Sequence, residues 1–181
     1  MNASILALAS AAVLVSACST TEMKSAESMS MSMPSTVQVP AGHQVALETV
    51  GIGEITYQCS AKKGMAGQFE WAFVGPDAVL TDRSGQVIGK YYGPPATWAN
   101  NDGSKVTGKQ LATAPAGEGN IPLQLVQAKP AMGKGMMQGV TYIQRLATRG
   151  GVAPADSCDT SNLGSKVIVK YQADYLFWKA A

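Results

Sequence analysis

The stretch KVIVKYQADYLFWK, residues 166–179, decides the fold class. Its apolar and polar residues alternate with a period of two, which is the spacing of a β-strand with one buried face. One face of this strand carries Val167, Val169, Tyr171, Ala173, Tyr175 and Phe177. The register is strongly constrained, because a slip of one residue would turn this whole set toward water.

The same alternation recurs along the chain from residue 45 onward. It is clearest in EITYQCSA (54–61) and QFEWAFV (68–74), and further strands are predicted in VALET (45–49), AVLTDRSGQVIGKYY (78–92), KVTGKQLAT (105–113), IPLQLVQA (121–128) and VTYIQRLAT (140–148). Turn residues punctuate these segments every 8 to 12 residues or so, which is roughly the spacing of sandwiches and barrels. We therefore predict one all-β domain, a β-sandwich or partly closed barrel of about nine to ten mostly antiparallel strands.

Composition limits the classes of partner. The chain has 181 residues, 14% of them charged, and a formal net charge of +2. Nucleic-acid binding needs clustered Lys and Arg to neutralise phosphates, whereas here the basic residues are scattered. The composition therefore favours a single globular domain that does not bind nucleic acid.

The first residues are typical of a bacterial export signal. Residues 1–17 hold no charged side chain and an apolar run from Ile5 to Val15, shorter than the roughly 20 residues that span a bilayer. Val15-Ser16-Ala17-Cys18 resembles a lipobox, so we expect Cys18 to be lipidated after the signal is removed. Ser19 follows it where proteins retained in the inner membrane carry Asp, so we expect anchoring in the outer membrane, facing the periplasm. An ordinary secretory signal is the alternative.

Three regions follow from this interpretation: a signal peptide at 1–17, a disordered tether at 18–37 and an all-β domain at 38–181. The tether is rich in Ser and Met and carries Met29, Met31 and Met33. Spaced thioethers are soft ligands for Cu(I), but unstructured small residues are also what any tether contains. We predict no metal or cofactor for the domain.

Two cysteines remain once Cys18 is assigned to lipid. An even number in an oxidising compartment indicates a disulfide between Cys59 and Cys158. Closing a loop of about 100 residues would stabilise the domain by about 4 to 5 kcal/mol on the chain-entropy model. Free or metal-binding thiols are the alternative, but the chain has no CxxC and a single histidine, His43.

A candidate ligand site lies in residues 90–104, KYYGPPATWANNDGS. Aromatic faces beside amide and carboxylate groups on a Gly/Pro loop suit a sugar or another small polar ligand. The alternative is a structured loop that packs its tryptophan on the core. Gln144 and Arg145 interrupt an apolar strand, and Arg145 can pair with a carboxylate. The predicted ligand-binding residues are Tyr92, Trp98, Asn101, Asp102, Gln144 and Arg145.

We therefore expect an envelope lipoprotein that binds a small polar or carbohydrate ligand without catalysis. One alternative is a structural or assembly protein that contacts another envelope protein through a sheet edge or apolar patch. A second is a hydrolase, which would use His43 or a carboxylate pair. The candidate carboxylates are Glu54, Glu70, Asp102 and Asp174.

Several of these segments resemble the family called domain of unknown function 3455, found in exported bacterial and secreted fungal proteins. The matching pieces span residues 38–178: VPAGHQVALETVGIGEITYQC, FEWAFVGPDAVL, GKYYGPPATWANNDGS, GNIPLQLVQA, GVTYIQRLATRGGVAPADSC and YQADYLFW. The resemblance implies an all-β extracytoplasmic domain of unestablished role. Some fungal members carry a malate dehydrogenase label, but this chain has no nucleotide-binding βαβ pattern.

Overall fold

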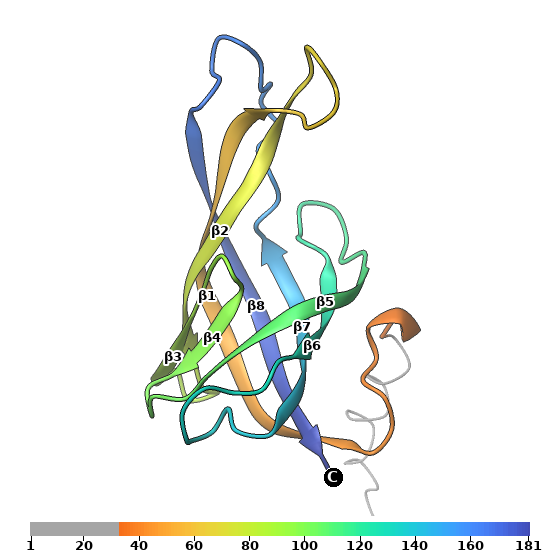
Figure 1. Cartoon of the computed structure of the whole chain (residues 1–181), viewed down its shortest axis with the longest axis vertical. Coiled ribbons are helices and arrows are strands. Elements are labelled where there is room, and N and C mark those ends of the chain that lie inside the picture. Colours follow the sequence, from red (N-terminus) through yellow and green to blue (C-terminus); the bar gives the residue numbers. More distant parts are fainter. Residues whose placement is uncertain (1–32) are drawn as a thin grey trace, which may run out of the picture. The chain divides into compact units, whose positions relative to one another are not determined.

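A computed structural model describes residues 33–181. Eight antiparallel strands follow one another around a closed barrel, and the first strand pairs with the last (Figure 1). The all-β prediction is confirmed, and the sheet closes in a ring. The strands are β1 (His43–Ala61), β2 (Phe69–Thr81), β3 (Val87–Tyr92), β4 (Thr97–Asn100), β5 (Lys105–Ala114), β6 (Leu123–Ala128), β7 (Val140–Gly150) and β8 (Lys166–Ala180).

The strand count is eight rather than nine to ten. The segments 45–49 and 54–61 form one strand, β1, and the segments 68–74 and 78–81 lie in β2. Glycines between the first two segments indicated a break, yet the strand runs through them. A Cβ at Gly51 would lie 2.6 Å from the ring of Tyr175, so glycine there permits close packing inside the barrel. Conversely, β4 forms inside a segment expected to be a loop.

Aromatic side chains fill much of the barrel interior. The ring of Trp98 stacks on that of Tyr91 with centroids 4.7 Å apart, and it meets the ring of Tyr175 edge-on at 5.9 Å. All three belong to one buried cluster that also includes Ile143 and Phe177. An eight-stranded barrel has an interior just wide enough to be filled by side chains or to hold one small ligand.

Three strands extend beyond the rest of the barrel. Figure 1 shows β1, β2 and β8 rising past the β3–β4 hairpin, with the loop before β8 beside the β1–β2 turn. A disulfide joins Cys59 of β1 to Cys158 of that loop, with 5.4 Å between the Cα atoms. The indole N–H of Trp71 donates to the carbonyl of Asp156 at 2.8 Å. The predicted disulfide is confirmed, and it fixes the approach to the last strand.

The segment before β1 packs on the outside of β5 and β6. Ser35–Val37 forms a 3-10 helix, η1, and Val37 is fully buried. The Gln144 side chain donates to the carbonyl of Val37 at 2.7 Å. Packing thus begins at the end of the expected tether. The expected signal, Cys18 and most of the Met-rich tether lie at 1–32, outside the described residues.

No helix in the described part of the chain is both long and apolar enough to cross a membrane.

Candidate functional site

The predicted aromatic ligand residues lie on opposite faces of the barrel wall. Trp98 of β4 is opposite Tyr91 of β3 in the register, and both are buried in the interior. Tyr92 is the next residue along β3, so its side chain faces outward, and it is 40% exposed. The two residues therefore do not line one surface.

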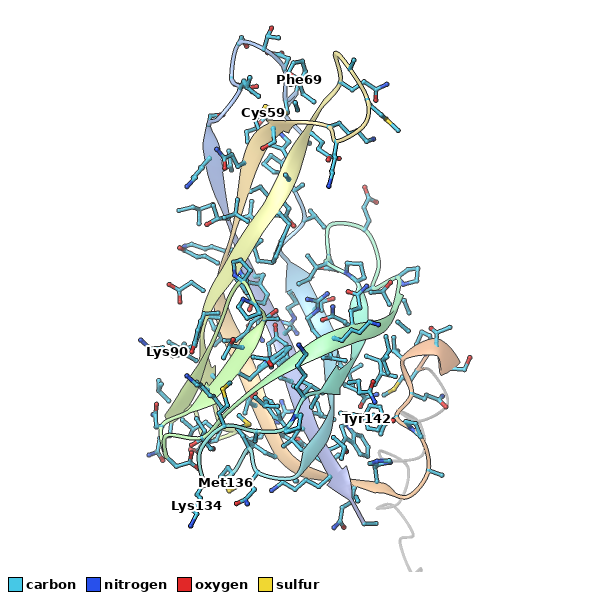
Figure 2. The ribbon with its side chains drawn as sticks, viewed as in Figure 1. Cys59, Phe69, Lys90, Lys134, Met136 and Tyr142 are labelled. Carbon is cyan, nitrogen blue, oxygen red and sulfur yellow. A yellow bond between two sulfur atoms is a disulfide. The ribbon has the colours of Figure 1, made fainter. Side chains whose placement is uncertain are left out.

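Asn101 and Asp102 hold together the turns at the lower end of the barrel. The Asn101 amide donates to the carbonyl of Val87 at 3.0 Å. The Asp102 carboxylate accepts from the backbone N–H of Met136 at 2.7 Å and from both the backbone and the hydroxyl of Ser104. These bonds, that from Met136 first, lower the pKa of Asp102. Figure 2 shows Met136 at this end of the molecule.

Gln144 and Arg145, although adjacent, also face opposite ways. Gln144 lies under η1 and accepts a hydrogen bond from the indole N–H of Trp178 at 2.8 Å. Arg145 is opposite the fully buried Tyr175 in the register, so it faces the interior. The structure thus distributes the six predicted residues among the core, the lower turns and the outer wall, rather than bringing them to one loop end.

The four candidate carboxylates are also dispersed. Asp174 shares Arg83 with Glu48, with oxygen–nitrogen distances of 3.0 and 3.1 Å. Glu70 of β2 lies opposite Ser60 of β1. Ser60 is six positions from Glu54 along β1, which corresponds to about 20 Å. Asp102 is at the lower end, where its oxygens are occupied by backbone N–H groups.

A hollow of about 570 Å³ lies at the lower rim of the barrel, where β1 begins, β6 ends and β7 begins. This volume is in the range of sites for small ligands, roughly 300 to 1,000 Å³. Its side chains include those of His43, Gln127, Gln138 and Tyr142, and the connection at 130–133 forms one wall. Figure 2 shows Tyr142 beside the segment that leads into β1.

Local sequence positions the two rings of this hollow. Gly42 has φ +85°, a left-handed conformation that glycine adopts readily, and it turns the chain into β1. The His43 ring then meets Tyr142 edge-on, with centroids 4.9 Å apart. Between Val140 and Tyr142 the register with β8 shifts by one residue, as at a β-bulge. Such shifts re-aim side chains and are common beside functional sites.

Several polar groups of the hollow have no hydrogen-bond partner in the described part of the chain. His43 Nδ1 donates to the carbonyl of Pro40 at 3.0 Å; because a carbonyl only accepts, the neutral ring presents Nε2 as an acceptor. Among the described residues, the Tyr142 hydroxyl and the amides of Gln127 and Gln138 have no hydrogen-bond partner. An aromatic ring beside amide and imidazole groups can bind hydroxyl-rich ligands.

The same hollow pairs His43 with no carboxylate or thiol, the usual partners of a histidine in acid–base catalysis or metal binding. Its lining contains no carboxylate, serine or cysteine, and the hydroxyl of Thr141 donates to the carbonyl of Trp178. Within residues 33–181, no group of three or more His, Cys, Asp or Glu side chains is arranged to hold a metal ion.

A second hollow, of about 550 Å³, lies in the β5–β6 connection. It is formed by residues of the 113–122 segment and includes Glu118 and Asn120, but no aromatic or cationic side chain. The hollow beside His43 therefore offers more varied recognition chemistry.

A family model described as protein of unknown function, DUF3455, matches residues 40–179. The chain belongs to this family. The match covers the whole barrel from just before β1 to the end of β8, which confirms the resemblance found in the sequence. No curated protein and no solved structure matches this DUF3455 chain.

Proposed function

We propose that this DUF3455 protein is an exported envelope lipoprotein, anchored in the outer membrane, whose barrel binds a small polar or carbohydrate ligand without catalysis. The ligand occupies the hollow beside His43. The disulfide supports export, because such bonds persist in oxidising compartments. The outer-membrane anchor depends on the lipobox and on Ser19.

The observation that carries the ligand proposal is the convergence of uncommitted polar groups and an aromatic ring in one concave site. Tyr142 supplies a flat apolar face, and the amides of Gln127 and Gln138 supply donors and acceptors. These residues were not predicted from the sequence. They come from strands and a loop that are distant from His43 in the sequence. Barrel closure brings them beside His43, and no local sequence pattern predicts that closure.

The two alternatives have less support. A hydrolase at His43 would need an activated nucleophile and an orienting carboxylate beside the ring. The hollow is lined by no carboxylate, and the hydroxyl of Thr141 donates to the carbonyl of Trp178. For a docking face, the exposed outer surface of β1, β2 and β8 carries Ile52, Val79 and Ile168. A row of charged residues separates Ile52 and Val79 from Ile168; the row is Lys170, Glu54 and Asp77.

A binding experiment on the single histidine tests the ligand site. Because His43 is the only histidine, its imidazole NMR signals report on this hollow without assignment. We expect N-acetylglucosamine, its β-1,4-linked trimer or glucose to shift these signals saturably. Tyr142→Ala should weaken the binding at least tenfold, or about 1.4 kcal/mol, because it removes the ring against which the ligand packs.

Tyr92→Ala is the matched control, since Tyr92 is an exposed tyrosine outside this hollow. It should leave the affinity unchanged. Signals that stay fixed at millimolar concentrations of all three sugars would contradict carbohydrate binding at His43.

The lipid anchor is tested by the intact mass of protein extracted from membranes. We expect the mature chain to begin at Cys18 and to carry a diacylglyceryl group. Cys18→Ser should abolish that added mass and release the protein from the membrane. A mature chain that begins elsewhere, without lipid mass, would contradict the anchor and leave the ligand proposal standing.

A further inference from the structure

The inner wall formed by β5, β6 and β7 carries a polar patch. Arg145 of β7 is opposite both Gln124 of β6 and the buried Tyr175 of β8 in the register. Residues opposite each other in an antiparallel sheet lie on the same face, so Gln124 and Arg145 face inward. Gln110 of β5 is opposite Val126, a member of the interior cluster, and accepts a hydrogen bond from the Gln124 amide.

Solvent can reach this patch because β5 pairs with β4 over only a short stretch. β4 and β5 pair only from Ala99 opposite Lys105 to Thr97 opposite Thr107. Figure 1 shows β5 running obliquely away from the β3–β4 hairpin. Beyond this pairing the inner face of β5 has no adjacent β4 strand, and Gln110 is exposed although it faces inward.

The Arg145 guanidinium is hydrogen-bonded to a neutral carbonyl group. Its Nε and Nη2 donate to the carbonyl of Pro122 at 3.1 and 2.9 Å. In the described part of the chain, the ion pairs involve Arg83 and none involves Arg145. A half-buried guanidinium without a carboxylate is costly, because its charge is partly withdrawn from water. An anion on this wall would offset that cost.

Two inward-facing donors also have no hydrogen-bond partner within residues 33–181. The Trp98 indole N–H is buried without a hydrogen bond, and the Tyr91 hydroxyl has none among the described residues. Buried polar groups in folded proteins are nearly always paired, so the Trp98 indole N–H calls for an explanation. Burial raises the pKa of Tyr91, and the positive charge of Arg145 opposes that rise. Tyr175 lies next to both residues, because it is opposite Arg145 in the register and its ring centroid is 5.1 Å from that of Tyr91.

We propose that the inner wall of the barrel binds a small monocarboxylate through the Arg145 guanidinium and the Tyr91 hydroxyl. Every unpaired group just described is a donor, which matches the acceptor oxygens of a carboxylate. The single cation balances one negative charge, and the aromatic cluster of Tyr91, Trp98 and Tyr175 lies next to it through Tyr175. This site is independent of the hollow beside His43.

Calorimetric titration with benzoate and benzamide tests the charge requirement. The two molecules have nearly the same shape, but only benzoate is an anion. We expect the wild-type protein to bind benzoate saturably and benzamide at least tenfold more weakly. Arg145→Gln should reduce benzoate binding by a similar factor, because charge-assisted hydrogen bonds are lost. Arg149→Gln is the matched control, since Arg149 is an exposed arginine on the same strand.

Tyr91→Phe keeps the ring and removes only the hydroxyl. This variant therefore tests the proposed site even if Arg145→Gln does not fold. We expect it to weaken benzoate binding severalfold and to leave the far-ultraviolet spectrum unchanged. A crystal soaked with 4-bromobenzoate should show anomalous scattering beside Arg145. The proposal is overturned if benzamide binds as well as benzoate, if benzoate does not bind at millimolar concentration, or if the bromine lies only on the outer surface.

Discussion

Replacing both Cys59 and Cys158 with serine is expected to lower the free energy of unfolding by about 4 to 5 kcal/mol. The two residues are 99 positions apart, so the disulfide closes a long loop and restricts the unfolded chain strongly. For a domain of this size, the change corresponds to a fall in Tm of roughly 10 to 20 °C. Thermal unfolding followed by circular dichroism measures it.

The native contacts around the disulfide should survive this double substitution. The backbone N–H of Cys59 donates to Ser165 at 2.9 Å, and the N–H of Gly164 donates to Cys59 at 2.9 Å. The control is a reducing agent, which should lower the Tm of the wild type and leave that of the double variant unchanged. Equal Tm values for the wild type and the variant would mean that the bond contributes nothing to stability.

Trp98→Ala is expected to destabilise the barrel by about 3 to 5 kcal/mol, the usual cost of truncating a buried aromatic residue. Trp98 is 1% exposed and contacts the rings of Tyr91 and Tyr175. Alanine would leave a cavity beside β4. Because β4 is the shortest strand of the barrel, it pairs with its neighbours over only a few residues. Urea unfolding, monitored by circular dichroism, gives the change in free energy.

Trp98→Phe separates the loss of volume from the loss of the indole N–H. Phenylalanine removes a buried donor that has no partner, which offsets part of the cost of the smaller ring. We expect a destabilisation well below that of alanine. Tyr92→Ala, on the outer face of the neighbouring strand, should cost less than about 1 kcal/mol. A Trp98→Ala protein as stable as the wild type would show that Trp98 is not part of the core.

Strand faces were predictable because alternation along a strand is a local property. The inward face of β8 was predicted correctly. The extent of β1 was not predicted, because Gly51 is typical of a turn and its contact with the ring of Tyr175 is visible only in the folded barrel. Barrel closure itself depends on pairing between β1 and β8, which no local pattern encodes.

The candidate sites were much less predictable. Trp98 sits in a Gly/Pro-rich segment that reads as a loop, yet four residues of it form β4 and carry the ring into the core. The hollow joins His43 to Tyr142, 99 positions away, through closure of the ring of strands. Arg145 was noticed as an interruption in an apolar strand, but its lack of an anion is visible only when its neighbours are placed.

Pairing of β1 with β8 also constrains the order of events during folding. Val45 lies opposite Trp178, so β1 can pair with its second neighbour only after β8 has been synthesised. Contacts so distant in sequence slow folding, and until they form both edge strands expose unpaired backbone groups that can recruit other chains. A nascent chain therefore remains vulnerable to aggregation until β8 has been synthesised and has paired with β1.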